Sequence, residues 1–288
     1  MVENKITCIH CKSQNFVKQG YRKTENRGKI QKYFCKDCKK YFTADNGFYR
    51  MRTSETIITM SIDMYLSNLS SRKMRNQLSR HLGVKRSHQS VMNGVYKYSL
   101  KVQKYVEKLD YLLGGEYYAD ETMIRRKTHD DRFWACVDWE TRLITGIHYS
   151  IEGNITEAKK FIQKAVIKGK PKFIQTDSAQ FYPRAFKKLF YSNKIKGLKI
   201  EHKINNVSKT KKHNYKIETV FMKIKDRVND FRGLKALWSA PIIMIGLTIQ
   251  HNFIEEHTTL RKVPCQLAEQ DLNVGENRWL GLIKLASS

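Results

Sequence analysis

The sequence predicts a mixed α/β protein in which a small metal-binding ribbon and a helical region precede a sheet flanked by helices. Three observations lead to this fold class. Two Cys-x-x-Cys pairs stand within the first 38 residues, residues 54–98 carry apolar positions at helical spacing, and strand-like runs alternate with helical ones from residue 117 onward. Changes in sequence character divide the 288-residue chain into four predicted parts, residues 1–46, 47–113, 114–235 and 236–288.

The cysteines of the first part are spaced as metal ligands. Cys8 and Cys11 form one pair, Cys35 and Cys38 form the other, and 23 residues separate the pairs. Four thiolates on two tight turns can enclose one tetrahedral zinc ion, and so small a module needs the metal in order to fold. Two disulfides are the alternative, but the pairs are regular and no signal peptide precedes them, so we expect a structural zinc ion in a zinc ribbon. The ribbon strands are expected at residues 16–20 and 31–34.

Three helices are predicted between the ribbon and the first long strand. The first covers residues 54–67, the second covers residues 71–82 and stops at Gly83, and the third follows Ser87. Helix, glycine-containing turn and helix are typical of helix-turn-helix DNA-binding modules, although a three-helix cap without a DNA role has a similar pattern. Residues 101–113 are expected to continue as a helical connector. The side chains expected to face DNA are Lys85, Arg86, His88, Gln89 and Asn93.

A sheet with mixed strand directions is predicted from residue 117 onward. The first three strands follow one another closely and favour antiparallel pairing, whereas helices separate the later strands and favour parallel pairing. An apolar run at residues 240–249 is too short to span a bilayer and predicts a buried helix that starts near Pro241. The strands are expected at residues 117–125, 132–139, 142–150, 172–177 and 199–204, and the helices at residues 155–168, 181–192 and 214–232.

Three acidic residues stand where this arrangement could bring them together. Asp120 lies in the first strand, Asp177 ends the short fourth strand, and Glu218 flanks the apolar face of the last helix. Two magnesium ions about 3.5–4 Å apart can activate a hydroxyl group and stabilise the leaving oxygen of a phosphodiester, and carboxylate oxygens suit magnesium. Lys225 follows Glu218 by about two helical turns, so its ammonium group could contact a DNA phosphate.

These residues resemble the DDE transposases of bacterial and archaeal insertion sequences. The resemblance implies an RNase H-like core in which Asp120, Asp177 and Glu218 bind metal and Lys225 contacts DNA. Forty residues separate Asp177 from Glu218, which is somewhat more than is familiar in that family. The resemblance covers residues 117–257 and rests on Ala-Asp-Glu-Thr at 119–122, Thr-Asp-Ser at 176–178, Ile217-Glu218 with Lys225, Phe231-Arg-Gly-Leu-Lys235 and His251-Asn-Phe-Ile-Glu255.

Other assignments stay open at the level of the sequence. Glu121 should face away from the aspartate before it, because side chains alternate along a strand. Glu201, Glu255 and Glu256 are alternative third ligands, but Glu218 is preferred because Lys225 follows it within the same predicted helix. An RNase H-like nuclease or resolvase would cut DNA without joining strands. A regulator built from a zinc ribbon and a helix-turn-helix would bind DNA without catalysis.

The charge of the chain favours a nucleic-acid partner. Lys and Arg number 54 and Asp and Glu number 27, so the formal net charge is +27. Such an excess attracts phosphate backbones, and the binding should weaken steeply with salt. An anionic membrane surface is the competing partner, but no segment is long enough to cross a bilayer. No glycine-rich phosphate loop is visible, and no serine or cysteine stands in an evident nucleophile turn.

The sequence as a whole therefore predicts a DNA transposase. The ribbon and the helix-turn-helix are expected to recognise the ends of the element, and the RNase H-like domain is expected to cleave and transfer DNA strands with two Mg²⁺ ions, or with Mn²⁺ in their place. Because two ends must be brought together, we expect a homodimer or a higher oligomer, with contacts through residues 236–260. The expected location is the cytoplasm, at the nucleoid.

Overall fold

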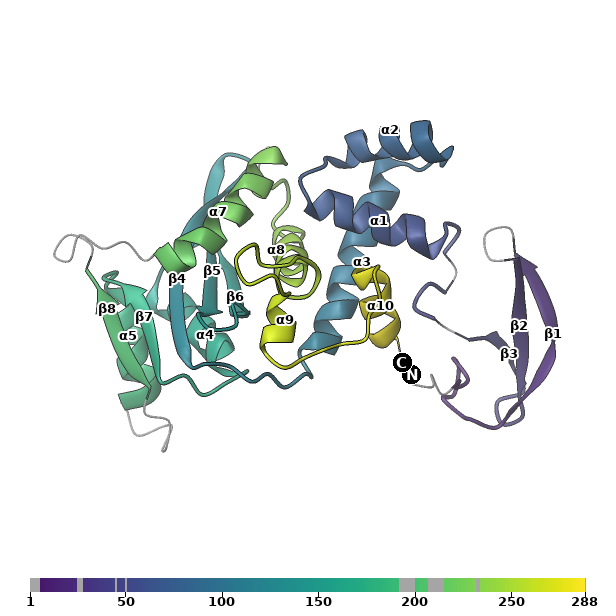
Figure 1. Cartoon of the computed structure of the whole chain (residues 1–288), viewed down its shortest axis with the longest axis horizontal. Helices are drawn as coiled ribbons and strands as arrows, with labels where there is room; N and C mark the ends of the chain where they lie inside the picture. Colours follow the sequence, from purple (N-terminus) through teal and green to yellow (C-terminus); the bar gives the residue numbers. More distant parts are fainter. Residues whose placement is uncertain are drawn as a thin grey trace.

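Two separate sheets and a set of helices make up the computed structural model of the protein (Figure 1). The mixed α/β class predicted from the sequence is confirmed. The structure describes residues 6–24, 28–44, 46–49, 51–191, 200–206, 215–231 and 234–287. The predicted element ends at residues 192, 199, 214 and 232 lie outside these described residues.

The N-terminal sheet is antiparallel and has the strand order β1-β2-β3. Its strands are β1 (Phe16–Thr24), β2 (Gly28–Cys35) and β3 (Tyr41–Thr43). Both predicted strands are present and longer than expected, whereas the three residues of β3 are too few to show a sequence period. Phe16, Tyr33 and Phe42 pack edge-on or stacked beside Cys8 and Cys35 in a small core of their own. Figure 1 shows this sheet at one end of the molecule, apart from the larger body.

The three predicted helices follow the ribbon. They are α1 (Glu55–Leu66), α2 (Ser71–Leu82) and α3 (His88–Val106). Each helix begins after a serine, Ser54, Ser70 or Ser87, whose hydroxyl accepts a hydrogen bond from a backbone N–H of the first turn. Such a cap stabilises a helix by about 1 kcal/mol. Helix α2 ends at Gly83, which has a left-handed backbone with φ of 63° and closes the turn before α3.

The connector between α3 and the large sheet is not helical, so the prediction for residues 101–113 is wrong beyond Val106. Lys168 donates hydrogen bonds to the carbonyl oxygens of Glu107 and Leu109, the second at 2.9 Å. The backbone N–H of Leu112 donates to the carbonyl oxygen of Ala268, in the C-terminal segment, at 3.1 Å. Partners distant in sequence replace the intrahelical bonds here, and a local sequence period cannot reveal them.

The large sheet holds five strands in the order β6-β5-β4-β7-β8. Strands β4, β5 and β6 are antiparallel, whereas β7 runs parallel to β4 and β8 runs parallel to β7. This order and these directions confirm the predicted RNase H-like sheet. The strands are β4 (Glu116–Arg126), β5 (His129–Asp138), β6 (Ile144–Ser150), β7 (Phe173–Asp177) and β8 (Glu201–Asn205).

Helices cover both faces of the large sheet. On one face, Trp134 and Tyr182 lie in the core formed with α4 and α5, and their rings are 5.8 Å apart. On the other face, Phe221 of α7 packs 6.4 Å from Phe133 of β5. The helices are α4 (Ile155–Val166), α5 (Phe181–Phe186) with the π-helical turn η1 (Lys187–Tyr191), and α7 (Tyr215–Asp230).

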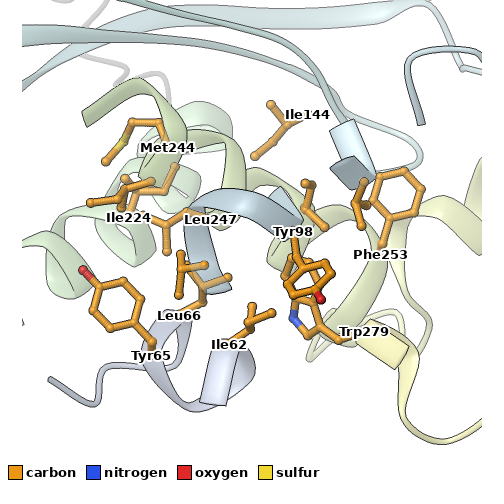
Figure 2. Close-up of a cluster of buried hydrophobic side chains, with 14 of the residues drawn as sticks. Ile62, Tyr65, Leu66, Tyr98, Ile144, Ile224, Met244, Leu247, Phe253 and Trp279 are labelled. Carbon is orange, nitrogen blue, oxygen red and sulfur yellow. The ribbon is translucent and has the colours of Figure 1, made fainter. Parts of the chain in front are cut away.

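The C-terminal segment packs back onto α1, α3 and the sheet. Figure 2 shows Met244 and Leu247 of α8 in one apolar cluster with Leu66 of α1 and Ile224 of α7. The buried helix predicted near Pro241 is therefore confirmed. No helix in the described part of the chain has the length and apolar character of a membrane span. The elements are α8 (Ala240–Ile249), the π-helical turn η2 (Gln250–Ile254), α9 (Pro264–Leu267) and α10 (Arg278–Leu285).

The burial of α8 limits which side chains of residues 236–260 could take part in the expected oligomer contact. The apolar side chains of this helix are used within the chain, because α8 packs against α3 and β6. Within residues 236–260, all of them described, the exposed large hydrophobic side chains are Leu237 and Trp238. The apolar run forms the inner layer between the helical region and the sheet, and an oligomer contact through residues 236–260 stays a prediction.

Candidate active site and metal centres

The candidate active site lies where β7 ends beside the middle of β4. Strand β7 stops at Asp177, whereas its neighbour β4 passes through Asp120 and continues to Arg126. Carboxylate oxygens of Asp120, Glu121 and Asp177 all lie within 4.8 Å of one another. Ligand sites in open sheets form at the carboxyl ends of parallel strands, which is the position of Asp177. The structure thus brings Asp120 and Asp177 together, as predicted, and places the carboxylate of Glu121 beside them.

Glu121 leaves β4 on the face opposite to Asp120, as expected from strand alternation. Tyr117 and Ala119 lie in the core on the side of α4 and α5, and Glu121 accepts a hydrogen bond from Tyr182 of α5 on that side. Its carboxylate nevertheless reaches the two aspartates. The predicted direction of the Glu121 side chain is therefore correct, but the sequence does not reveal that its carboxylate reaches the site. Alternation fixes the direction in which a side chain leaves the strand, but a long side chain can end at the same place as a short one from the other face.

Burial and neighbouring carboxylates raise the pKa of Asp120 to about 7. Desolvation is the largest cause, and Glu121, Asp177 and Glu218 add negative charge nearby. The backbone N–H of Glu121 donates to Oδ1 of Asp120 at 2.9 Å and acts in the opposite direction. Burial also raises the pKa of the Glu121 carboxyl group. Carboxylates that oppose one another's ionisation in this way favour a cation between them.

Glu218 lies on α7, on the face of the sheet toward which Asp120 points. Tyr118 and Ile124, which leave β4 on the same face as Asp120, belong to the core that includes α7. Glu218 is half-buried and close enough to Asp120 to raise the pKa of that carboxyl group, although it is not among the three carboxylates that meet within 4.8 Å. Lys225 is exposed on the same helix.

The alternative third carboxylates have other surroundings. Glu201 forms an ion pair with Lys203 at 3.8 Å. Glu255 forms an ion pair with Arg227, and Glu256 is exposed to solvent. Of the four sequence candidates, Glu218 is the one that contributes to the raised pKa of Asp120. The electrostatics of the site therefore favour Glu218 as the third carboxylate.

The four predicted cysteine ligands lie together beside the ribbon sheet. The Sγ atoms of Cys8 and Cys38 are 3.6 Å apart, those of Cys11 and Cys35 are 3.5 Å apart, and all four lie within 4.8 Å of one another. Tetrahedral zinc with Zn–S bonds of about 2.3 Å places sulfur atoms about 3.8 Å apart, whereas a disulfide requires about 2.05 Å. All four cysteines are free, so the geometry fits a metal ion and not two disulfides.

The backbone around the second cysteine pair eases ionisation of one thiol. Backbone N–H groups, first that of Cys38 and then that of Asp37, lower the pKa of Cys35 to about 7, although burial opposes this effect. Burial raises the pKa of Cys38 to about 12. Thiolates packed this closely repel one another, so the first ionises readily and the others require a cation.

The predicted DNA-facing side chains lie around the start of α3. Gln89 and Asn93 are exposed one turn apart, and Nε2 of Gln89 donates to Oδ1 of Asn93 at 3.0 Å. Lys85 is exposed and His88 is partly exposed. Lys97 is exposed one turn beyond Asn93 on the same face of the helix, and the spacing of four residues in the sequence could have identified it.

Arg86 differs from the other four because its guanidinium group is turned toward the protein. Its Nη2 atom donates to the hydroxyl of Ser90 at 2.9 Å. Its Nε and Nη1 atoms are buried and have no hydrogen-bond partner among the described residues. Burial lowers the pKa of Arg86. The sequence identified a basic residue in the turn before α3 but could not show that it packs inward.

Comparison with known proteins identifies a family for the segment that contains this site. A family model for the DDE domain of the IS240 type matches residues 115–257, which include Asp120, Asp177 and Glu218. A search of curated proteins gives no match. Similar solved structures include the HTLV-2 integrase catalytic core domain in complex with magnesium, which is 18% identical, covers 56% of this chain and 100% of that chain, and has a TM-score of 0.41.

Two further integrase structures show the same level of similarity. A simian T-cell lymphotropic virus intasome in complex with PP2A regulatory subunit B56 gamma is 14% identical over 73% of this chain and 74% of that chain, with a TM-score of 0.43. The catalytic core domain of BIV integrase is 11% identical over 53% of this chain and 93% of that chain, with a TM-score of 0.38. At these scores the likeness adds nothing to what the strand order and the family match establish.

Proposed function

This chain belongs, through residues 115–257, to the DDE transposases of insertion sequences, and we propose that it binds the ends of its own element and cleaves and transfers DNA strands with divalent metal ions. The observation that carries the proposal is the meeting of Asp120 and Asp177 at the carboxyl end of β7, beside the helix that bears Glu218. Two separate strands and a helix supply these carboxylates, as the sequence predicts.

The donor set fits a magnesium or manganese site. Carboxylate oxygens are hard donors of the kind that both ions prefer, and the mutual repulsion of these groups is relieved by a cation. We assign Asp120, Asp177 and Glu218 as the ligands. When bound, two such ions supply activation of a water or a 3′-hydroxyl and stabilisation of the leaving oxygen of the phosphodiester.

The residues of the chain have distinct tasks in this proposal. Asp120 gives up its proton before it can bind a cation, and its pKa of about 7 places that step near neutral pH. Helix α7 positions Glu218 at the site and presents Lys225 to solvent, where its ammonium group holds a DNA phosphate. One helix thus aligns the DNA backbone with the carboxylates.

The N-terminal parts are proposed to recognise the DNA. The four-cysteine cluster holds a structural zinc ion, which fixes the ribbon. The exposed side chains at the start of α3, with Lys85 in the preceding turn, face the DNA groove. The net charge of +27 favours this partner, and at least a dimer is required to hold two element ends. We propose four parts along the chain: the zinc ribbon (1–46), the helix-turn-helix region (47–113), the catalytic domain (114–235) and a C-terminal helical extension (236–288).

The test is strand cleavage and joining on labelled DNA that carries the ends of the element, in the presence of Mg²⁺. Wild-type protein is expected to give joined strands, and Asp177→Ala is expected to give neither cleaved nor joined products. Asp130→Ala is the matched control, because Asp130 is an exposed carboxylate at the far end of β4 and β5, paired with Arg125 at 3.8 Å. Cleavage without joining would favour a nuclease. Binding without either product would favour a regulator.

A further inference from the structure

Glu121 is held at the candidate active site by two donors. Nη1 of Arg132 donates to Oε1 of Glu121 at 2.9 Å, and the hydroxyl of Tyr182 donates to Oε2 at 2.7 Å. The Glu121 side chain is only 9% exposed, and Tyr182 is fully buried. Two elements, β5 and α5, therefore fix this carboxylate against β4. A carboxylate held only for solubility would have neither the burial nor the two partners.

The two donors leave Glu121 able to bind a cation. An ionised carboxylate has about four lone-pair positions. Arg132 and Tyr182 occupy one on each oxygen, so each oxygen keeps one that is not used by them. One of these oxygens lies within 4.8 Å of carboxylate oxygens of both Asp120 and Asp177.

The negative charge of the carboxylate cluster exceeds the charge that Arg132 can neutralise. Asp120, Glu121 and Asp177 carry three negative charges when ionised, and in the described part of the chain the ion pair formed with this cluster is that of Arg132 with Glu121. One guanidinium group leaves an excess of negative charge on carboxylates that lie within 4.8 Å of one another. A divalent cation compensates this excess, and hydrogen-bond partners such as Tyr182 are the usual means by which proteins orient a metal ligand.

We propose that Glu121 is a further member of the metal site, oriented by Arg132 and Tyr182. Asp120 and Glu218 approach from the face of the sheet covered by α7, whereas Glu121 approaches from the face covered by α4 and α5. The cation is thereby held from both faces at the end of β7. The inference rests on the proposed function and adds a ligand from the opposite side of the sheet.

The experiment is Mn²⁺ binding by the full chain without DNA, measured from the electron paramagnetic resonance signal of the free ion. Glu121→Gln keeps the shape of the side chain but removes its charge and replaces one accepting oxygen with a donating amide nitrogen. We expect it to raise the Kd for Mn²⁺ about 10–100-fold, and Tyr182→Phe to raise it by a smaller factor. Asp177→Asn is the reference for loss of the site.

Glu157→Gln is the matched control. Glu157 lies on α4 and is likewise held by two partners, Lys160 at 2.7 Å and His148 at 2.6 Å, but it is not part of the carboxylate cluster. Its replacement should leave the Kd for Mn²⁺ unchanged. Equal binding by wild type and Glu121→Gln, with weaker binding by Asp177→Asn, would overturn the role of Glu121 alone. Equal binding by wild type and Asp177→Asn would overturn the proposed active site as well.

Thermal unfolding separates a ligand from a merely structural ion pair. If Glu121 is a ligand, Glu121→Gln should reduce the rise in Tm that Mn²⁺ causes in the wild type. If Glu121 only links β4 to β5 and α5, Glu121→Gln should lower the Tm without metal and leave the Mn²⁺-induced rise intact. The second result would overturn the inference.

Discussion

Asp120 combines burial with a crowd of like charges, and its titration should therefore be visible in the stability of the metal-free site. The pKa of an isolated aspartate is 3.8, whereas that of Asp120 in the folded chain is raised to about 7. An acid with a higher pKa in the folded state binds its proton more tightly there. Its contribution favours folding below about pH 4 and is lost as the pH rises through 7.

We predict that, without added Mg²⁺ or Mn²⁺, this group lowers the free energy of unfolding by about 3 kcal/mol between pH 5 and pH 8. Asp120→Asn removes the titration, so the variant should lose less stability over this range than the wild type. The comparison also cancels the contribution of the partly buried His202 and His251, because both proteins contain them. Their pKa values are lowered to about 4, so they act on stability in the opposite direction at acid pH.

The measurement is thermal unfolding of both proteins at matched pH values, with and without Mg²⁺. Mg²⁺ competes with the proton on Asp120, so its stabilising effect on the wild type should be larger at pH 8 than at pH 5. Parallel pH profiles for wild type and Asp120→Asn would contradict the raised pKa of Asp120.

Two glycines show how the same residue type serves different purposes in α2 and α3. Gly83 ends α2 with a φ of 63°, a conformation that side-chain-bearing residues rarely adopt, and an added Cβ would meet nothing within 4 Å. Gly94 lies inside α3, where its backbone is helical, and an added Cβ would also meet nothing within 4 Å. Backbone conformation alone therefore separates the two positions.

We predict that Gly83→Ala destabilises the protein by about 1 kcal/mol, because alanine is strained in the left-handed conformation. Gly94→Ala should stabilise it by about 0.5–1 kcal/mol, because alanine loses less conformational entropy in a helix. Chemical denaturation monitored by tryptophan fluorescence checks both. A destabilised Gly94→Ala variant would show that the space beside α3 is needed by a neighbour.

The sequence predicts well those elements whose signals are local, such as helix caps and the alternation of short strands with helices. The ends of α2 and the start of α3 follow from Gly83 and Ser87, and the five-strand order follows from the alternation of short strands and helices. The errors lie where distant residues decide. Lys168 and Ala268 hold residues 107–112 out of a helix, and the reach of Glu121 depends on Tyr182, which is 61 residues away in the sequence.

At the scale of the whole molecule, the ribbon has a small hydrophobic core of its own, and larger hydrophobic cores lie among the helices and the large sheet. The ribbon core is formed around the cysteines and aromatic rings of residues 6–44 and is separate from the clusters that join the helices and the large sheet. The sequence predicted the ribbon as a unit but treated residues 236–288 as an extension. In the structure α8 completes the core between α3 and the sheet, because its apolar side chains face both.

This division predicts that zinc removal unfolds the ribbon and leaves the larger body folded. A small core with four unpaired thiolates is not stable without its cation, whereas the remaining clusters contain no metal ligand of the ribbon. After zinc chelation, the four ribbon cysteines should react with a thiol reagent under native conditions. Cys136 and Cys265 are buried in the larger body and should stay protected.

Tryptophan fluorescence provides the independent measure, because all four tryptophans lie outside residues 1–46. Chelation should expose the four thiols without shifting the emission or its thermal transition, and it should weaken binding to the element ends. Cys8→Ser should reproduce this behaviour, since three thiolates do not close a structural zinc site. If chelation shifts the thermal transition followed by tryptophan emission, the ribbon instead stabilises the larger body, which includes α1 and α10.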